Sequence, residues 1–418
     1  MYTPLIENQI RQHIDAEQIR AAWLAAESRA MNYRGSMYWK QIKGREYLYR
    51  EYSDRTGKSL GARSPETEKI IEDFKFGKAA AEAKFKELND AMATQARLNV
   101  ALRVGRTPNV VVGILEEIRK AGLQGHFMVI GTNALYAYET HVGVRFTGDV
   151  TATTDMDLLW DSRKRITLIV DGDDHFNQNG LIGVLKKYDA SFELQEDQKF
   201  TAANAQGYMI DLIKRRPQSF YDDNEQQQMI PHPDDFWATK IRNMDWLLSS
   251  PKFTQVVVAT NGSMAEMVTV DPRAFACYKV WLSEKEDRNP MKKPRDLAQA
   301  RAVYQLVQDK MPQLSFDRIH ALPEKLRNQR VLDILRPDTP GGQSLASQFD
   351  AVRAYGTHTG TIAAISEAEV IQHIGRGRHV VWDRAALAGV ALKVGSNVTI
   401  ERGGRVRDTQ KKGTSHER

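Results

Sequence analysis

The spacing of apolar and polar residues changes several times along the chain, and each spacing predicts a different element. Residues 5–31 place apolar side chains at roughly helical intervals, which predicts one or two amphipathic helices. Residues 35–61 instead contain short aromatic-rich runs between turn glycines, which is typical of a hairpin or small meander. Ser64 followed by Pro65 then predicts the start of a long, alanine-rich helix that continues to about residue 104.

Beyond residue 105, helical and strand patterns alternate. A helix is predicted over 109–121, ended by Gly122, and another near 178–188. Short apolar runs before and after the second helix predict strands at "HFMVI", "DMDLLW", "RITLIV" and "YMIDLI". This order predicts an α/β (α+β) fold with a mixed sheet and flanking helices.

The last part of the chain contains two further patterns. Residues 272–310 read as two helices joined by a basic loop, and turn-forming residues over 336–344 mark a boundary. Alternating runs separated by glycines over 355–407 predict a small β domain. We therefore predict five regions: N-terminal helices and hairpin (1–104), α/β core (105–235), mainly helical subdomain (236–335), small β domain (350–407) and disordered tail (408–418).

Composition narrows the class of protein. The chain has 418 residues, of which 41% are hydrophobic, and 59 basic against 53 acidic side chains leave a net charge of +6. This mild excess permits a polyanionic partner without requiring one. Cys277 is the single cysteine, which excludes an intramolecular disulfide and a cysteine-based zinc site. No window is long and apolar enough for a membrane helix, so we expect a cytoplasmic protein without a membrane partner.

The aromatic segment over residues 38–50 has two interpretations. Its tyrosines, lysines and arginines are the residue types of a stacking and phosphate-binding surface for nucleic acid. Alternatively, the aromatic side chains face a core and the cations face water, which is the more common arrangement.

Two aspartates separated by one residue place two negative charges close together. In a strand over 155–160, Asp155 and Asp157 share one face, while Met156 and Leu158 point to the other. Two such carboxylates repel each other, and a divalent cation between them removes that conflict. Asp211 lies in another apolar, strand-like run and is the candidate third ligand. The alternative is that these aspartates end strands or cap turns. Oxygen ligands of this kind suit Mg²⁺, with Mn²⁺ as a second candidate ion.

A glycine turn upstream favours the metal interpretation. The strand ending at Gly131 and Thr132 leads directly into a predicted helix, where free backbone N–H groups favour an anion. Glycine at this position would let the backbone approach a phosphate closely. A phosphate cradle beside paired aspartates indicates metal-assisted phosphoryl chemistry.

These residues resemble the signature of polymerase-beta-type nucleotidyltransferases, in which a glycine and a small residue precede an acidic pair and a later third acid. The resemblance covers residues 35–330 and matches Gly131-Thr132, Asp155-Met156-Asp157 and Asp211. It implies a nucleotidyltransferase-fold sheet and transfer of a nucleoside monophosphate from a nucleoside triphosphate to a hydroxyl of RNA or protein. Related toxin and phage-defence enzymes further imply that Lys279 assists at the triphosphate and that Arg295-Asp296 fills the later basic-acidic pair. Thr132 and a longer segment before the acidic pair depart from the common pattern.

The C-terminal region resembles a second family, the KfrB-like domain found in proteins of plasmids and other mobile elements. The stretch from "GTHTGTIAAISEAEV" to "VGSNVTIERGGRV" carries the pattern. This resemblance gives a competing hypothesis, a non-catalytic nucleic-acid-binding or maintenance protein of a mobile element. Under the first hypothesis, the enzyme would be a toxin or defence effector of such an element.

Lys279 alone could equally be an ordinary lysine whose ammonium group reaches solvent from an apolar helix.

Overall fold

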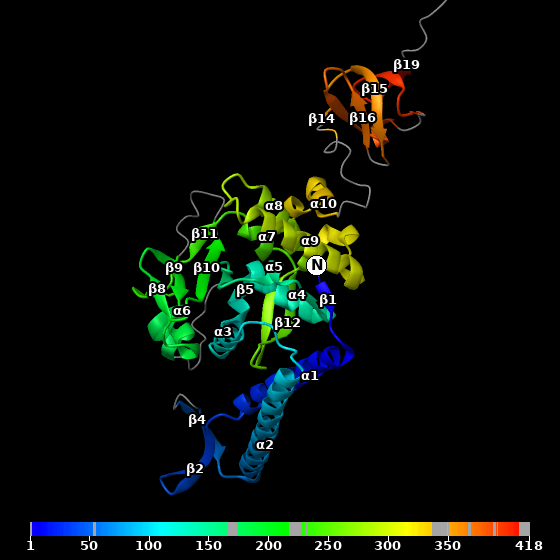
Figure 1. Cartoon of the computed structure of the whole chain (residues 1–418). Coiled ribbons are helices and arrows are strands. Elements are labelled where there is room, and N and C mark those ends of the chain that lie inside the picture. Colours follow the sequence, from blue (N-terminus) through cyan, green and yellow to red (C-terminus); the bar gives the residue numbers. More distant parts are fainter. Residues whose placement is uncertain are drawn as a thin grey trace, which may run out of the picture. The chain divides into compact units, whose positions relative to one another are not determined.

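The computed structural model describes two compact units, residues 1–335 and 336–418. The described residues are 2–408 except 53–55, 165–173, 217–226, 231, 337–348, 350, 367–368, 388–389 and 391. The predicted strand "RITLIV" and nearly all of the predicted disordered tail therefore lie outside the described residues. Helices and strands of the first unit are interleaved in a mixed α+β arrangement, as the sequence predicts (Figure 1).

The first unit begins with two long helices packed side by side in opposite directions, α1 (Glu7–Asn32) and α2 (Pro65–Ala101). Polar contacts run along their interface, since Gln12 Nε2 donates to Asn99 Oδ1 at 2.9 Å and Trp23 Nε1 donates to Asn89 Oδ1 at 2.6 Å. Ser64 caps α2 as predicted, because its hydroxyl accepts from the Thr67 N–H in a capping box.

A three-stranded antiparallel sheet connects the two long helices (Figure 1). Its strands are β2 (Ser36–Ile42), β3 (Arg45–Glu51) and β4 (Gly57–Ala62), which confirms the predicted meander. Leu48 is fully buried and the Arg50 guanidinium lies 4.3 Å from the ring centroid of Phe74 on α2. The expectation that all cations of this segment face water is therefore wrong for Arg50.

The central sheet has the strand order β5-β7-β10-β9-β8. β7 and β10 are parallel, β5 and β9 run antiparallel to them, and β11 pairs in parallel with the second half of β10. The strands are β5 (Phe127–Ile130), β7 (Asp155–Trp160), β8 (Glu193–Gln195), β9 (Gln198–Ala203), β10 (Met209–Arg215) and β11 (Thr239–Ile241).

The two faces of this sheet enter different hydrophobic cores. Met156, Leu158 and Leu212 belong to the core that contains residues of α3 (Asn109–Lys120) and α6 (Asp174–Tyr188). On the other face, Ile130 and Ile213 pack in the core formed by α4 (Ala134–Val142), α8 (Pro272–Glu284) and α9 (Lys293–Lys310). Side chains of a strand alternate between faces, so Asp155, Asp157 and Asp211 lie on this second face.

Helices cover the second face, and a hairpin contributes residues to both cores. The helices are α4 (Ala134–Val142), α5 (Gly148–Thr151), α7 (Met244–Leu248), α8 (Pro272–Glu284), α9 (Lys293–Lys310) and α10 (Gln329–Leu335). The hairpin consists of β12 (Lys252–Val258) and β13 (Met264–Val270), and a further short pair joins β1 (Tyr2–Pro4) to β6 (Val144–Phe146). The sequence pattern predicted α8 and α9 but not the strands over 239–270.

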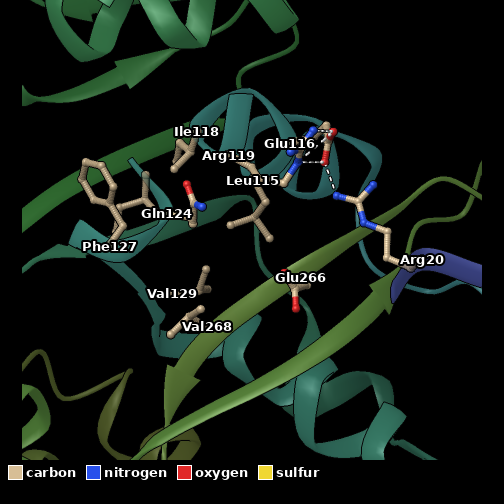
Figure 2. A pocket seen from close by; sticks show the side chains of 11 residues that line it. Arg20, Leu115, Glu116, Ile118, Arg119, Gln124, Phe127, Val129, Glu266 and Val268 are labelled. Carbon is tan, nitrogen blue, oxygen red and sulfur yellow. Dashed lines mark hydrogen bonds and ion pairs between the residues drawn. The ribbon is translucent and has the colours of Figure 1, made fainter. Parts of the chain in front are cut away.

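Buried ion pairs fasten α1 to the α/β core. Arg20 on α1 and Arg119 on α3 both reach Glu116, at 2.5 and 2.8 Å (Figure 2). Arg119 also pairs with Glu27 at 2.6 Å. Beside this cluster is a cavity of about 40 Å³ with walls that include Phe127 and Val129. A space of this size accommodates water rather than a metabolite.

The second unit is a six-stranded sheet with its own small core. Its strand order is β14-β17-β16-β15-β18-β19, and Trp382 and Gln372 form a buried hydrogen bond of 2.9 Å at its centre. Its strands are β14 (Val352–Arg353), β15 (His358–Ile365), β16 (Glu369–His373), β17 (His379–Asp383), β18 (Asn397–Ile400) and β19 (Val406–Asp408).

Within the part of the chain that the structure describes, no helix combines the length and the apolar character needed to span a membrane.

Candidate functional site

Three neighbouring strands bring the predicted acidic residues together. In the parallel pair β7–β10, Asp157 lies directly opposite Asp211. On its other side, β7 pairs antiparallel with β5, so that Asp157 is also opposite Ile130. Neighbouring strands are about 4.8 Å apart, and residues in register share a face. Gly131, directly after β5, therefore lies beside the carboxylates, as the sequence motif requires.

Gly131 has a second, steric reason to be glycine. Its φ of 69° lies in the left-handed region, and a Cβ atom built here would be 2.1 Å from Asp157 Oδ2. The bare backbone at Gly131 thus makes room for the Asp157 carboxylate. The sequence predicted close approach of a phosphate at this glycine. In the structure, the backbone of Gly131 lies against Asp157, which is a candidate metal ligand.

Mutual repulsion and burial change the acidity of two of the aspartates. Burial raises the pKa of Asp157 to about 7, and the charges of Asp155 and Asp211 add to this increase. Burial likewise raises the pKa of Asp211, although a 2.6 Å hydrogen bond from the Thr201 hydroxyl favours its ionised form. Lys279 and Lys292 oppose the increase for Asp157. Bringing a cation to this site would relieve the repulsion.

Neighbouring side chains hold the aspartates in place. Thr153 Oγ1 donates to Asp155 Oδ1, and Asn133 Nδ2 donates to the Asp155 carbonyl at 2.6 Å. Thr201 lies opposite Asp211 on β9. Sequence reasoning missed these residues. Thr153 is two residues before Asp155 and could have been found from strand alternation, but Thr201 depends on a pairing that no local pattern specifies.

Thr132 joins the glycine turn to helix α9. Its hydroxyl oxygen accepts hydrogen bonds from Gln299 Nε2 at 3.1 Å and from an Arg295 guanidinium nitrogen at 3.5 Å. Arg295 also donates to the carbonyl of Ala152. Because the Thr132 oxygen serves as an acceptor in both contacts, its own O–H is available to donate to a phosphate.

Lys279 is buried rather than extended to solvent, so the alternative of a solvent-reaching lysine is wrong. Its ammonium group donates to Asp296 at 2.7 Å, and Arg288 contacts the other oxygen of Asp296 at 2.8 Å. Burial lowers the pKa of Lys279, and the Asp296 charge opposes that change. The two later residues singled out by the sequence therefore have different partners: Arg295 contacts Thr132, and Asp296 neutralises Lys279.

A cavity of about 290 Å³ opens beside the acidic residues. Gly131, Asp157 and Lys279 line one part of it, and Tyr278 and Arg288 contribute from α8 and the following loop. Its remaining walls are mostly apolar, from Ile213, Ile241, Met244, Leu247, Val270, Phe275 and Leu282. A mainly apolar recess with a few converging charged groups is the usual form of a small-molecule site.

The carboxylates fit an open Mg²⁺ site, in which other ligands complete the coordination. Among the described residues, no three His, Cys, Asp or Glu side chains are placed so that together they could hold a metal ion. Mg²⁺ is ordinarily bound through one or two carboxylates, with the remaining positions filled by water and substrate phosphates. The Asp155 and Asp157 carboxylates repel each other, and both offer oxygen atoms as metal ligands. These two properties suit this open arrangement. The aspartates therefore match an ion that arrives with a phosphate ligand.

Comparison with known proteins decides the family. A family model described as Nucleotidyltransferase matches residues 109–322, which is more than half of the chain and includes all the residues of this site. The chain belongs to this nucleotidyltransferase family. A second model, described as KfrB Domain, matches residues 357–410 of the nucleotidyltransferase. No curated protein and no solved structure matches the chain.

Proposed function

We propose that this nucleotidyltransferase transfers a nucleoside monophosphate from an Mg²⁺-bound nucleoside triphosphate to a hydroxyl group of an RNA or protein acceptor, with release of pyrophosphate. The observation that carries the proposal is the register of three strands, which places Asp157 between Asp211 and the Gly131 turn. Mn²⁺ is a second candidate ion. When bound, the metal would neutralise charge on the triphosphate and lower the pKa of the attacking hydroxyl.

The residues of the site have separate roles in this reaction. Asp155 and Asp157 hold the metal, and the turn at Gly131 and Thr132 donates hydrogen bonds to the phosphates. Asp211 accepts the proton of the acceptor hydroxyl, since a carboxylate with a raised pKa is a stronger base than an ordinary one. Lys279, which lines the same cavity and is held by Asp296, would assist at the triphosphate.

The KfrB domain supports a biological setting for the same reaction. The match covers residues 357–410. Because this region resembles domains found in proteins of plasmids and other mobile elements, we propose a toxin or defence role. It also supports the second candidate function, nucleic-acid binding without catalysis. Salt-dependent DNA binding that survives loss of Asp155, Asp157 and Asp211, without any nucleotide transfer, would favour that second function.

The transfer itself is tested with nucleotides labelled at the α-phosphate. The full chain is incubated with each of the four labelled ribonucleoside triphosphates and Mg²⁺, against total RNA and against total protein. We expect label in one macromolecular fraction, removed by nuclease or by protease according to the acceptor, and none in the presence of EDTA. Absence of label with every nucleotide and both ions, or label that persists in EDTA, would contradict the proposal.

A further inference from the structure

The outer face of the β2–β4 sheet carries a group of aromatic and basic side chains. Tyr38 and Tyr49 are opposite each other on neighbouring strands, with nearly parallel rings whose centroids are 6.5 Å apart. The Lys40 ammonium lies 5.0 Å from the centroid of the Tyr49 ring, and Tyr47 is opposite Lys40. We call Tyr38, Lys40, Arg45, Tyr47 and Tyr49 the tyrosine face.

Strand alternation shows that this face points away from the helices. Leu48 and Arg50, between and beside the tyrosines, point toward α2, where Leu48 is 0% exposed. Tyr38 is 40% exposed, and Lys40 and Arg45 are exposed as well. The tyrosines therefore do not serve the core of this small sheet. Tyr47 and Tyr49 are half-buried beside their neighbours on this face, so burial in a core does not describe Tyr38 and describes the other two only in part.

Positive charge is concentrated in the same small sheet. Its described residues, 36–52 and 56–62, contain five lysines and arginines but only two glutamates. Without Arg50, which points toward α2, the surplus is two, compared with +6 for all 418 residues. The turn between β2 and β3 adds a further signal, because Lys43 has a φ of 49° beside Gly44 at 75°. Asparagine or glycine is the ordinary choice for such a turn, so a lysine here keeps a cation at some conformational cost.

We propose that the tyrosine face binds single-stranded nucleic acid. Unpaired bases stack on aromatic rings whatever their sequence, while nearby cations contact the phosphates. An exposed sheet with stacking aromatics is a recurrent way of binding single-stranded RNA. A protein partner fits less well, because lysine is depleted from protein–protein interfaces and here lysine accompanies the tyrosines.

The tyrosine face is separate from the family domain. It lies in residues 36–62, whereas the nucleotidyltransferase model begins at residue 109. Binding at this face therefore does not depend on the proposed function. The additional step, that the bound strand is RNA and is the acceptor of the nucleotide, does rest on it.

The test measures fluorescence anisotropy of a labelled, mixed-sequence RNA oligonucleotide, and of DNA with the same sequence, with the full chain. We expect Tyr49→Ala to weaken binding about 5- to 150-fold, which corresponds to about 1–3 kcal/mol for one stacked base. Tyr49→Phe should keep most of the affinity, because the ring remains. Tyr355→Ala is the matched control, since Tyr355 is 81% exposed and lies in the other unit.

Salt dependence tests the cations separately. Replacing Lys40, Lys43 and Arg45 by alanine should flatten the slope of log affinity against log salt by about 2, or about 0.7 for each lost phosphate contact on a single strand. Lys86→Ala, an exposed lysine on α2, should leave the slope unchanged. Circular dichroism melts confirm that each variant is folded.

Unchanged binding in Tyr49→Ala, or an equal loss in Tyr355→Ala, would overturn the inference. Failure of the full chain to bind either RNA or DNA would also overturn it. The same holds if a crosslinker placed at position 49 captures a protein and the chain binds neither polymer. Preference for RNA over DNA would identify the strand as RNA, and equal affinity would assign the face to single strands generally. If Tyr49→Ala weakens binding but no nucleotide is ever transferred, the inference stands and the proposed function fails.

Discussion

Replacing Asp157 with asparagine is expected to reduce nucleotide transfer by at least about 10³-fold. Asp157 is the central acid of the three, opposite Asp211 and against the bare backbone of Gly131. The amide keeps the shape of the side chain but removes the negative charge that would hold the metal. Metal-assisted charge stabilisation is worth several kcal/mol in the transition state, and each 1.36 kcal/mol is tenfold in rate.

The measurement is the initial rate of label transfer at saturating nucleotide and Mg²⁺. Asp90→Asn is the matched control, because Asp90 is an exposed aspartate on α2 and the same chemical change there should leave the rate unchanged. Transfer by Asp157→Asn within tenfold of the unsubstituted enzyme would show that this carboxylate does not hold the metal.

The same substitution is expected to stabilise the fold, and to do so more strongly at high pH. The pKa of Asp157 is about 7 in the folded chain, against an ordinary value of 3.8. Between these two values the folded state keeps a proton that the unfolded state has lost, so stability falls as pH rises through that window. Above pH 7 the ionised carboxylate costs on the order of 4 kcal/mol, from about three pKa units at 1.36 kcal/mol each.

Urea unfolding in EDTA at about pH 5 and about pH 8 measures this effect. Asparagine cannot ionise, so the variant should gain about 3 kcal/mol relative to the unsubstituted chain between the two pH values. Other titrating groups are common to both proteins and cancel in the difference. An identical pH dependence for the two proteins would mean that Asp157 is ordinarily acidic in the folded state.

Local patterns in the sequence predicted the parts of the site that depend on one strand or one turn. Alternation places Asp155 and Asp157 on one face with Met156 on the other, and the structure has this arrangement. Likewise, the change from strand to helix at Gly131 is visible as a glycine between an apolar run and a helical one.

Features that depend on pairing between distant segments could not be predicted in the same way. The opposition of Asp157 to Asp211 requires that β7 and β10 be neighbours in one particular register, which is specified by the whole core. The contact of Lys279 with Asp296 joins two helices whose relative position the sequence does not state. β12 and β13, by contrast, contain β-branched residues such as Val256 and Val268, which are a local signal for strands.

The central claim is that these aspartates and the Gly131 turn bind a nucleotide together with a divalent ion. Calorimetric titration with a nucleoside triphosphate analogue that cannot be cleaved between the α- and β-phosphates tests it without knowledge of the acceptor. We predict binding in Mg²⁺ that disappears in EDTA and in Asp157→Asn, and that persists in Asp90→Asn. Equal affinity with and without the metal, or in the presence and absence of the Asp157 carboxylate, would contradict the account.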